Sequence, residues 1–154
     1  MLSDSQKLQW LYDIECIKQL KARYCAFADQ NYDPDGIASL FVPDGVWDGG
    51  PFGRHEGRAA IHAFFTGVSK VISFVNHYAT NPLIEVDGDR ATGRWDLWAP
   101  IVKEPEPVAA WIMGKYREDY VRVDGCWMFR NLSLDLRALS PYDQGFARQR
   151  IADL

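Results

Sequence analysis

The 154-residue sequence has no excess of positive charge, no long apolar run and no even set of cysteines. Its 17 Lys and Arg residues are outnumbered by 21 Asp and Glu residues, which argues against binding to nucleic acid or to an anionic membrane. No stretch approaches the roughly 20 apolar residues of a membrane span, and the first ten residues lack the apolar run of a signal peptide. The three cysteines predict free thiols in a reducing compartment, and hence a cytoplasmic protein.

Several motifs of well-known chemistries are also missing from the sequence. It contains no glycine-rich phosphate loop, no CxxC, no HExxH and no GxSxG, which argues against nucleotide binding and covalent serine chemistry. The only histidines are His55, His62 and His77, and the seven-residue gap between the first two matches no metal-ligand spacing. We therefore expect no metal site and no cofactor, with His55 in solvent and His62 at the border of the core.

Apolar and aromatic residues are abundant instead. They make up 47% and 14% of the chain, which is typical of one soluble globular domain over residues 1–154. Six Trp, seven Tyr and eight Phe exceed the usual need of a core of this size. This excess favours a cavity lined with aromatic rings.

The N-terminal half of the chain has the patterning of helices. Apolar residues recur every three or four positions over residues 5–28, which predicts one long amphipathic helix. Shorter helices are predicted over residues 37–41 and 57–68, with a strand around Val46 and Trp47 between them.

The C-terminal half has the patterning of a sheet. Strands are predicted over residues 74–86, 91–102, 108–123 and 126–139, with hairpin turns at 87–89 and 124–125. Helices followed by a long antiparallel meander predict an α+β fold, in which N-terminal helices pack on one face of a curved, mainly antiparallel sheet. The tail over residues 141–154 is expected to be either a loosely docked terminus or a lid or subunit contact.

Two residues in these elements could carry acid–base chemistry. His77 lies in a predicted strand, where a buried imidazole normally has a hydrogen-bond partner. Asp29 follows the predicted long helix, where an aspartate is typical of a turn or a cap. From the residues alone, a structural and a functional interpretation of each remain open.

Five segments, in order along the chain, resemble the SnoaL-like family of the scytalone dehydratase and bile-acid 7α-dehydratase type. They are residues 15–30, residues 57–61, His77, residues 89–95 and residues 116–127, and the similarity spans about residues 10–140. The resemblance implies a cone-shaped α+β barrel with an internal cavity, which is shared with ketosteroid isomerase and hexachlorocyclohexane dehydrochlorinase.

The resemblance also implies catalytic residues. The family's Asp/His pair falls on Asp29 and His77, its catalytic tyrosine on Tyr24 and its functional arginine on Arg137. The sequence departs from the dehydratase pattern where Ala99 takes the place of an acidic residue. An Asp/His pair suits proton removal next to a carbonyl, because the carboxylate fixes the tautomer of a neutral imidazole and stabilises the imidazolium.

Aromatic residues could form the wall of the substrate cavity, although a core position is an equally good interpretation for each. The candidates are Trp47, Phe52, Phe64, Phe65, Trp95, Trp98 and Trp111.

The function predicted in this way is that of a cofactor-independent lyase. It would be a dehydratase that eliminates water from a hydroxylated cyclic ketone, such as a polyketide or a steroid, and its ligand would be a small hydrophobic ring. The alternatives are an isomerase or cyclase on the same scaffold, and a noncatalytic binding or oligomerisation module. The resemblance further implies a homo-oligomer, commonly a trimer.

Overall fold

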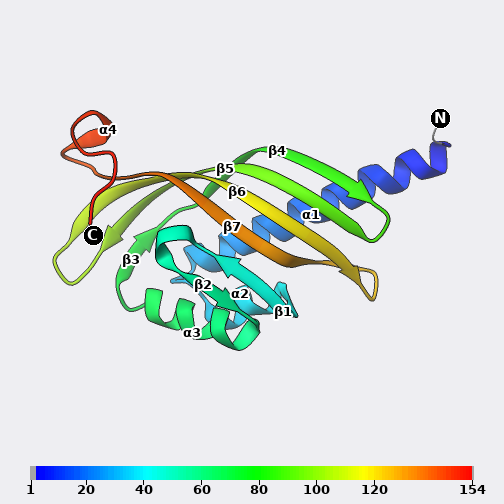
Figure 1. The fold of residues 1–154 in the computed structure, drawn as a ribbon, viewed down its shortest axis with the longest axis horizontal. Helices are drawn as coiled ribbons and strands as arrows, with labels where there is room; N and C mark the ends of the chain where they lie inside the picture. Colours follow the sequence, from blue (N-terminus) through cyan, green and yellow to red (C-terminus); the bar gives the residue numbers. More distant parts are fainter. Residues whose placement is uncertain (1–2, 154) are drawn as a thin grey trace.

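The computed structural model describes residues 3–153 and begins with a 26-residue helix, α1 (Asp4–Asp29). Ser3 and Gln6 form a capping box, in which each side chain accepts a hydrogen bond from the backbone N–H of the other. The prediction of a helix over residues 5–28 is confirmed. Leu8 and Leu11 of the predicted apolar stripe are exposed, because the first turns of α1 project beyond the sheet (Figure 1).

The second helix lies earlier than predicted. It is α2 (Pro34–Ser39), because Pro34 occupies its first turn and the Asp33 side chain accepts a hydrogen bond from the Gly36 N–H. Phe41, which was predicted to end this helix, instead opens strand β1 (Phe41–Asp48).

Helix α3 agrees with its prediction. A 3-10 turn, η1 (Gly50–Phe52), and a short strand, β2 (Arg54–Glu56), lead from β1 to α3 (Arg58–Val68), which confirms the helix predicted over residues 57–68.

Seven strands form one mixed sheet. The remaining five are β3 (Ile72–Val75), β4 (Tyr78–Asp87), β5 (Arg90–Lys103), β6 (Val108–Val123) and β7 (Cys126–Pro141). The order is β2-β1-β7-β6-β5-β3, with β4 also paired to β5; among these seven strands of the described chain, only the β1–β7 pairing is parallel. The sheet is strongly curled into a half-barrel against which the helices pack, so the predicted α+β class is confirmed (Figure 1).

One predicted strand is in fact two. The chain over residues 74–86 is interrupted at Asn76 and His77, which separate β3 from β4. Both strands pair with β5, with Val75 opposite Ile101 and Tyr78 opposite Trp98. His77 therefore lies in a break between strands, where its backbone N–H is free to bond outside the ladder.

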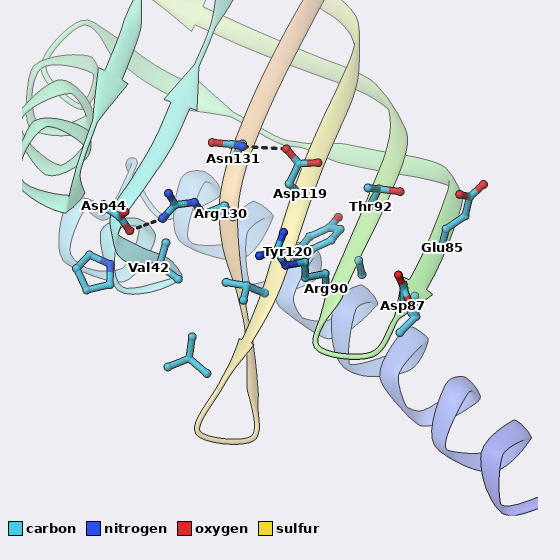
Figure 2. Close-up of a pocket in the computed structure, with 15 residues that line it drawn as sticks. Val42, Asp44, Glu85, Asp87, Arg90, Thr92, Asp119, Tyr120, Arg130 and Asn131 are labelled. Carbon is cyan, nitrogen blue, oxygen red and sulfur yellow. Dashed lines mark hydrogen bonds and ion pairs between the residues drawn. The ribbon is translucent and has the colours of Figure 1, made fainter.

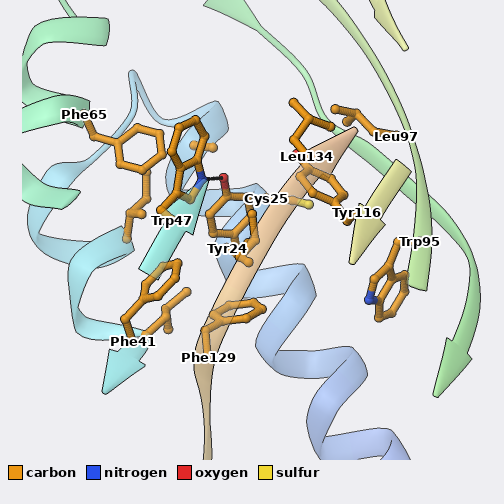
Figure 3. Close-up of a cluster of buried hydrophobic side chains, with 14 of the residues drawn as sticks. Tyr24, Cys25, Phe41, Trp47, Phe65, Trp95, Leu97, Tyr116, Phe129 and Leu134 are labelled. Carbon is orange, nitrogen blue, oxygen red and sulfur yellow. Dashed lines mark hydrogen bonds between the residues drawn. The ribbon is translucent and has the colours of Figure 1, made fainter. Parts of the chain in front are cut away.

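The two faces of the sheet differ in burial. On β5 the odd-numbered residues Ala91, Trp95, Leu97, Ala99 and Ile101 are buried, whereas the side chains between them point to the other face. Aromatic rings from α1, β1 and β7 pack over this inner face (Figure 3).

A buried carboxylate ties α1 to the far end of the sheet. Asp13 accepts hydrogen bonds from the guanidinium of Arg122 on β6, at 2.5 and 3.3 Å, and from the indole of Trp127 on β7, at 3.1 Å. This arrangement fixes the position of α1 along the sheet.

The C-terminal tail returns to the sheet. After helix α4 (Gly145–Arg148), the backbone N–H of Leu139 donates to the Arg150 carbonyl and the Ala152 N–H donates to the Leu139 carbonyl, both at 2.9 Å. The tail is thus docked on β7. Within residues 3–153, no helix is both long and apolar enough to span a bilayer.

Candidate active site

Asp29 and His77 meet where the end of α1 faces the break between β3 and β4. The distance between His77 Nδ1 and Asp29 Oδ1 is 2.7 Å, and the same oxygen accepts the backbone N–H of His77 at 2.9 Å. The His77 side chain is 7% exposed and that of Asp29 is 23% exposed. The contact that the sequence predicts between these two residues is therefore present.

This contact determines which imidazole nitrogen can act as a base. Because a carboxylate only accepts hydrogen bonds, Nδ1 carries the proton in the neutral imidazole that faces Asp29. Nε2 then keeps its lone pair, and it has no hydrogen-bond partner among residues 3–153. His77 can accept a proton at Nε2 while Asp29 stabilises the resulting imidazolium.

A cavity of about 260 Å³ lies beside His77, between the helices and the inner face of the sheet. Its partly exposed rim includes Phe52 and Val71, and its floor is buried. The lining is largely apolar and comprises Tyr24, Tyr32, Trp47, Phe52, Phe64, Phe65, Val68, Val71, Ile72, His77, Leu97, Ile101, Lys103, Ile112, Tyr116, Leu134 and Leu139.

Tyr24 lies on the floor of the cavity with its hydroxyl oriented by a neighbour. The indole Nε1 of Trp47 on β1 donates to the Tyr24 oxygen at 2.9 Å (Figure 3). Since the oxygen accepts this bond, the phenolic proton is available to another acceptor. Burial raises the pKa of Tyr24 well above its usual value, so the phenol is protonated at neutral pH and can donate.

Two further tyrosines, which the sequence analysis did not single out, also line the cavity. Tyr32 stacks on Phe65 with ring centroids 5.7 Å apart, and Tyr116 packs edge-on against Tyr24 at 6.3 Å. Burial raises the pKa of both phenols. No sequence motif marks either residue, because tyrosines are frequent in this chain.

Trp47, Phe52, Phe64 and Phe65 line the cavity, but three other tryptophans predicted there do not. Trp95 has the correct strand face, yet it lies farther along β5, where its indole donates to the Tyr120 hydroxyl at 3.0 Å. Trp98 and Trp111 are on the opposite face of the sheet and stack on each other at 5.3 Å. The prediction that these three form the cavity wall was wrong.

Arg137 is not brought to the cavity either. Met113 pairs with Ala138 and Gly114 with Leu136, so Arg137 is the extra residue of a β-bulge. Its side chain is 62% exposed and lies 3.5 Å from Asp135. In this chain the guanidinium therefore does not contact the Asp29 and His77 site.

Of the other two histidines, only His55 differs from expectation. His55 is partly buried: its ring stacks on Phe64 at 4.2 Å, and its Nε2 is buried without a hydrogen-bond partner among residues 3–153. His62 on α3 is half-buried, and its Nε2 lies 3.2 Å from the Asp35 carboxylate. Over the described residues, no group of three His, Cys, Asp or Glu side chains is placed to bind a metal.

A larger hollow of about 1020 Å³ lies elsewhere on the sheet, and it is an open groove (Figure 2). Two pairs of its polar groups are engaged with each other: Arg130 pairs with Asp44, and Asn131 donates to Asp119 at 2.8 Å. Since Asp29 and His77 do not line it, we place the candidate site in the smaller cavity.

Comparisons with known proteins agree with this fold. The profile of the SnoaL-like domain matches residues 9–133. A structure from Novosphingobium aromaticivorans whose name suggests a scytalone dehydratase is 26% identical, with a TM-score of 0.79 over 86% of this chain and 89% of that one. A Mycobacterium tuberculosis protein of unknown function, Rv3472, is 28% identical, with a TM-score of 0.75 over 86% and 76% of the two chains.

A more distant similarity concerns the fold alone. Hexachlorocyclohexane dehydrochlorinase of LinA type 3, from Novosphingobium barchaimii, is 23% identical, with a TM-score of 0.80 over 88% of this chain and 93% of that one. No curated protein matches the sequence.

Proposed function

The chain belongs to the SnoaL-like family, and from this premise we propose that it is a cofactor-independent lyase that eliminates water from a hydroxylated ring ketone. The observation that supports this proposal most directly is the contact between Asp29 and His77 beside an aromatic cavity. In this proposal, His77 Nε2 removes the proton next to the carbonyl, and Asp29 orients the imidazole through Nδ1. General-base assistance of this kind contributes roughly 10² to 10⁴ in rate.

Tyr24 is the proposed partner of the ketone oxygen. Removal of the α-proton shifts negative charge onto that oxygen, and a buried O–H donor stabilises the charge most where water is excluded. The hydrogen bond from Trp47 supports this role because it leaves the Tyr24 proton free. Trp47 is accordingly a positioning residue for Tyr24.

The lining of the cavity supports a neutral, hydrophobic ring as the substrate. Rings of Trp47, Phe64 and Phe65 cover one side, and aliphatic side chains of β5 and β7 cover the other. An apolar cavity with few polar groups binds an apolar body and orients it through those groups. Here they are the imidazole of His77, the cavity phenols and Lys103 at the end of β5.

One observation favours the isomerase or cyclase alternative. Ala99, at the place of the dehydratases' acidic residue, is fully buried and brings only a methyl group to the inner face. An isomerase needs no acid for a leaving group, whereas a dehydratase does.

Two measurements on tetralones test the proposal. In deuterated water, unsubstituted tetralone should exchange its α-protons in the presence of the protein, as followed by nuclear magnetic resonance. β-Hydroxytetralone should lose water to give a fluorescent naphthol. His77→Ala should abolish both reactions, whereas His62→Ala, a matched change at a half-buried histidine outside the cavity, should leave both unchanged.

The two results separate the candidate functions. Exchange together with loss of water supports the lyase, and exchange alone supports the isomerase or cyclase. Binding of tetralone without either reaction would overturn both and leave the noncatalytic binding module.

We also propose a homo-oligomer and a cytoplasmic location. The first is supported by the resemblance to oligomeric dehydratases, and the second by the free thiols of Cys16, Cys25 and Cys126.

A further inference from the structure

Tyr32 reaches the cavity through an unusual backbone turn. After α1, Asn31 and Tyr32 both have left-handed backbone conformations, with φ of 57° and 51°. For a bulky residue such as tyrosine this conformation is strained and uncommon. The Tyr32 N–H donates to the Ala28 carbonyl at 2.9 Å, which holds the turn closed.

The turn brings Tyr32 to the same place as the Asp29 and His77 pair. Its ring packs edge-on against the His77 ring, with centroids 5.9 Å apart and an interplanar angle of 86°. Phe65 stacks on the other side at 5.7 Å. The contact with Phe65 therefore holds the Tyr32 ring beside the His77 imidazole.

The hydroxyl of Tyr32 is unpaired within the described part of the chain. The residue is 8% exposed and lines the cavity, yet its hydroxyl forms no hydrogen bond with any residue in the range 3–153. Among residues 3–153, only His55 Nε2 is a fully buried polar side-chain atom without a partner, so the Tyr32 oxygen keeps accessible surface. An unpaired donor beside the proposed base is therefore free to bond a group of the bound substrate.

Position distinguishes Tyr32 from the other cavity phenols. The Tyr24 oxygen is already held by Trp47, and the Tyr116 ring lies under the ammonium of Lys21, 3.3 Å from its centroid. Tyr24 and Tyr116 contact each other, whereas Tyr32 contacts His77. Tyr32 thus lies nearest to the proposed base.

We propose that Tyr32 is a catalytic residue that protonates the leaving hydroxyl group. It would take over the role of the dehydratases' acidic residue, whose position is occupied by Ala99 in this chain. This inference rests on the proposed lyase function. Base and acid then lie side by side, as the removal of a hydrogen and a hydroxyl from adjacent carbons requires.

The proton balance closes without a cofactor. His77 Nε2 takes the α-proton, the electron pair of that C–H bond forms the new C=C bond, and the C–O bond breaks. The leaving oxygen takes the phenolic proton of Tyr32 and departs as water. The imidazolium of His77 then returns its proton to the Tyr32 phenolate, which restores both groups.

The test compares two leaving groups in Tyr32→Phe, a variant that removes only the unpaired hydroxyl and keeps the ring. Hydroxide needs a proton to depart, whereas acetate does not. We expect Tyr32→Phe to lower kcat for β-hydroxytetralone by about 10²-fold and for β-acetoxytetralone by less than about threefold. Tyr12→Phe, a matched change at an exposed tyrosine, should leave both rates unchanged.

The α-proton exchange of unsubstituted tetralone separates this proposal from the proposed function. Exchange at the wild-type rate in Tyr32→Phe, with slow loss of water, supports Tyr32 as the acid. Loss of water at the wild-type rate, or equal losses for both leaving groups, overturns that role while the lyase proposal stands. If the wild-type protein exchanges no α-proton, the lyase proposal fails, and the role of Tyr32 fails with it.

Discussion

Lys21 on α1 and Glu118 on β6 form a buried ion pair with 2.5 Å between Nζ and Oε1, and their side chains are 1% and 0% exposed. Glu118 also accepts a hydrogen bond from the Tyr120 hydroxyl, which in turn accepts one from the Trp95 indole. The pair therefore belongs to a continuous polar chain that links the helix to the sheet beneath the cavity floor.

Removal of one member of this pair should be strongly destabilising. Lys21→Met leaves an unpaired carboxylate in the core, and we expect it to lower the free energy of unfolding by about 3–5 kcal/mol. The double variant Lys21→Met, Glu118→Gln should recover part of the loss, because it removes both charges and keeps an acceptor for Tyr120. Urea unfolding followed by circular dichroism measures both; a loss below about 1 kcal/mol for Lys21→Met would contradict the burial of the pair.

Asp29→Asn should reduce turnover much more than stability. The change keeps the side-chain volume but removes the charge that stabilises the imidazolium of His77, and we expect kcat to fall by roughly 10² or more. His77→Ala should cost at least as much, and the double variant little more than the worse single one, because the two residues act as a unit. Asp35→Asn, at an exposed aspartate, is the control.

Stability and turnover of these variants must be measured together. Intact turnover combined with a melting temperature lowered by several degrees would show that the pair is a structural hydrogen bond. The enzyme proposal would then give way to the binding module.

Stability should fall in alkali because of the buried phenols. Burial raises the pKa of Tyr24, Tyr32 and Tyr116 in the folded state, whereas in the unfolded chain phenols ionise near pH ~10. Below that pH, the buried phenols do not change the free energy of unfolding with pH. Above it, the unfolded chain binds fewer protons than the folded protein, so the free energy of unfolding decreases as pH rises. Urea titrations across this range should show a shallower decrease for Tyr24→Phe than for the wild-type protein. Equal slopes in the two proteins would show that Tyr24 has the same pKa in the folded and unfolded states.

Self-association is expected through the outer face of the sheet. Tyr78, Trp98, Trp111 and Tyr142 form a continuous row of rings there, with successive centroids 5.9, 5.3 and 5.5 Å apart, and three of the four residues are more than 40% exposed. A second copy of the chain would cover this patch. Sedimentation should show an oligomer that Trp98→Ser weakens; a single 17.6 kDa species at micromolar concentration would refute it.

The elements with strong periodicity were predictable from the sequence. The long helix, α3 and the hairpins of β5, β6 and β7 all match, because burial of one face imposes a regular pattern on the residues. The break at His77 was not predictable, since the apolar residues on either side continue the strand pattern without a glycine or proline between them.

The candidate site was predicted in part. Asp29, His77 and Tyr24 came from the resemblance, and the structure brings them to one region. Strand alternation alone could have shown that Trp95 and Trp98 face opposite sides of β5, so both could not line one cavity. The bulge at Arg137 and the left-handed turn at Tyr32 depend on tertiary packing, and no local sequence pattern indicates either of them.

Asp29 and His77 are separated by 48 positions and belong to different layers, one at the end of α1 and the other between two strands. Their contact exists only while the helix is seated on the sheet. A small displacement of the helix end would separate the two groups without breaking any hydrogen bond between the strands of the sheet. On heating, turnover should therefore be lost at a lower temperature than the circular dichroism signal of the folded protein. The loss of turnover would then report the undocking of the helix end before the fold melts.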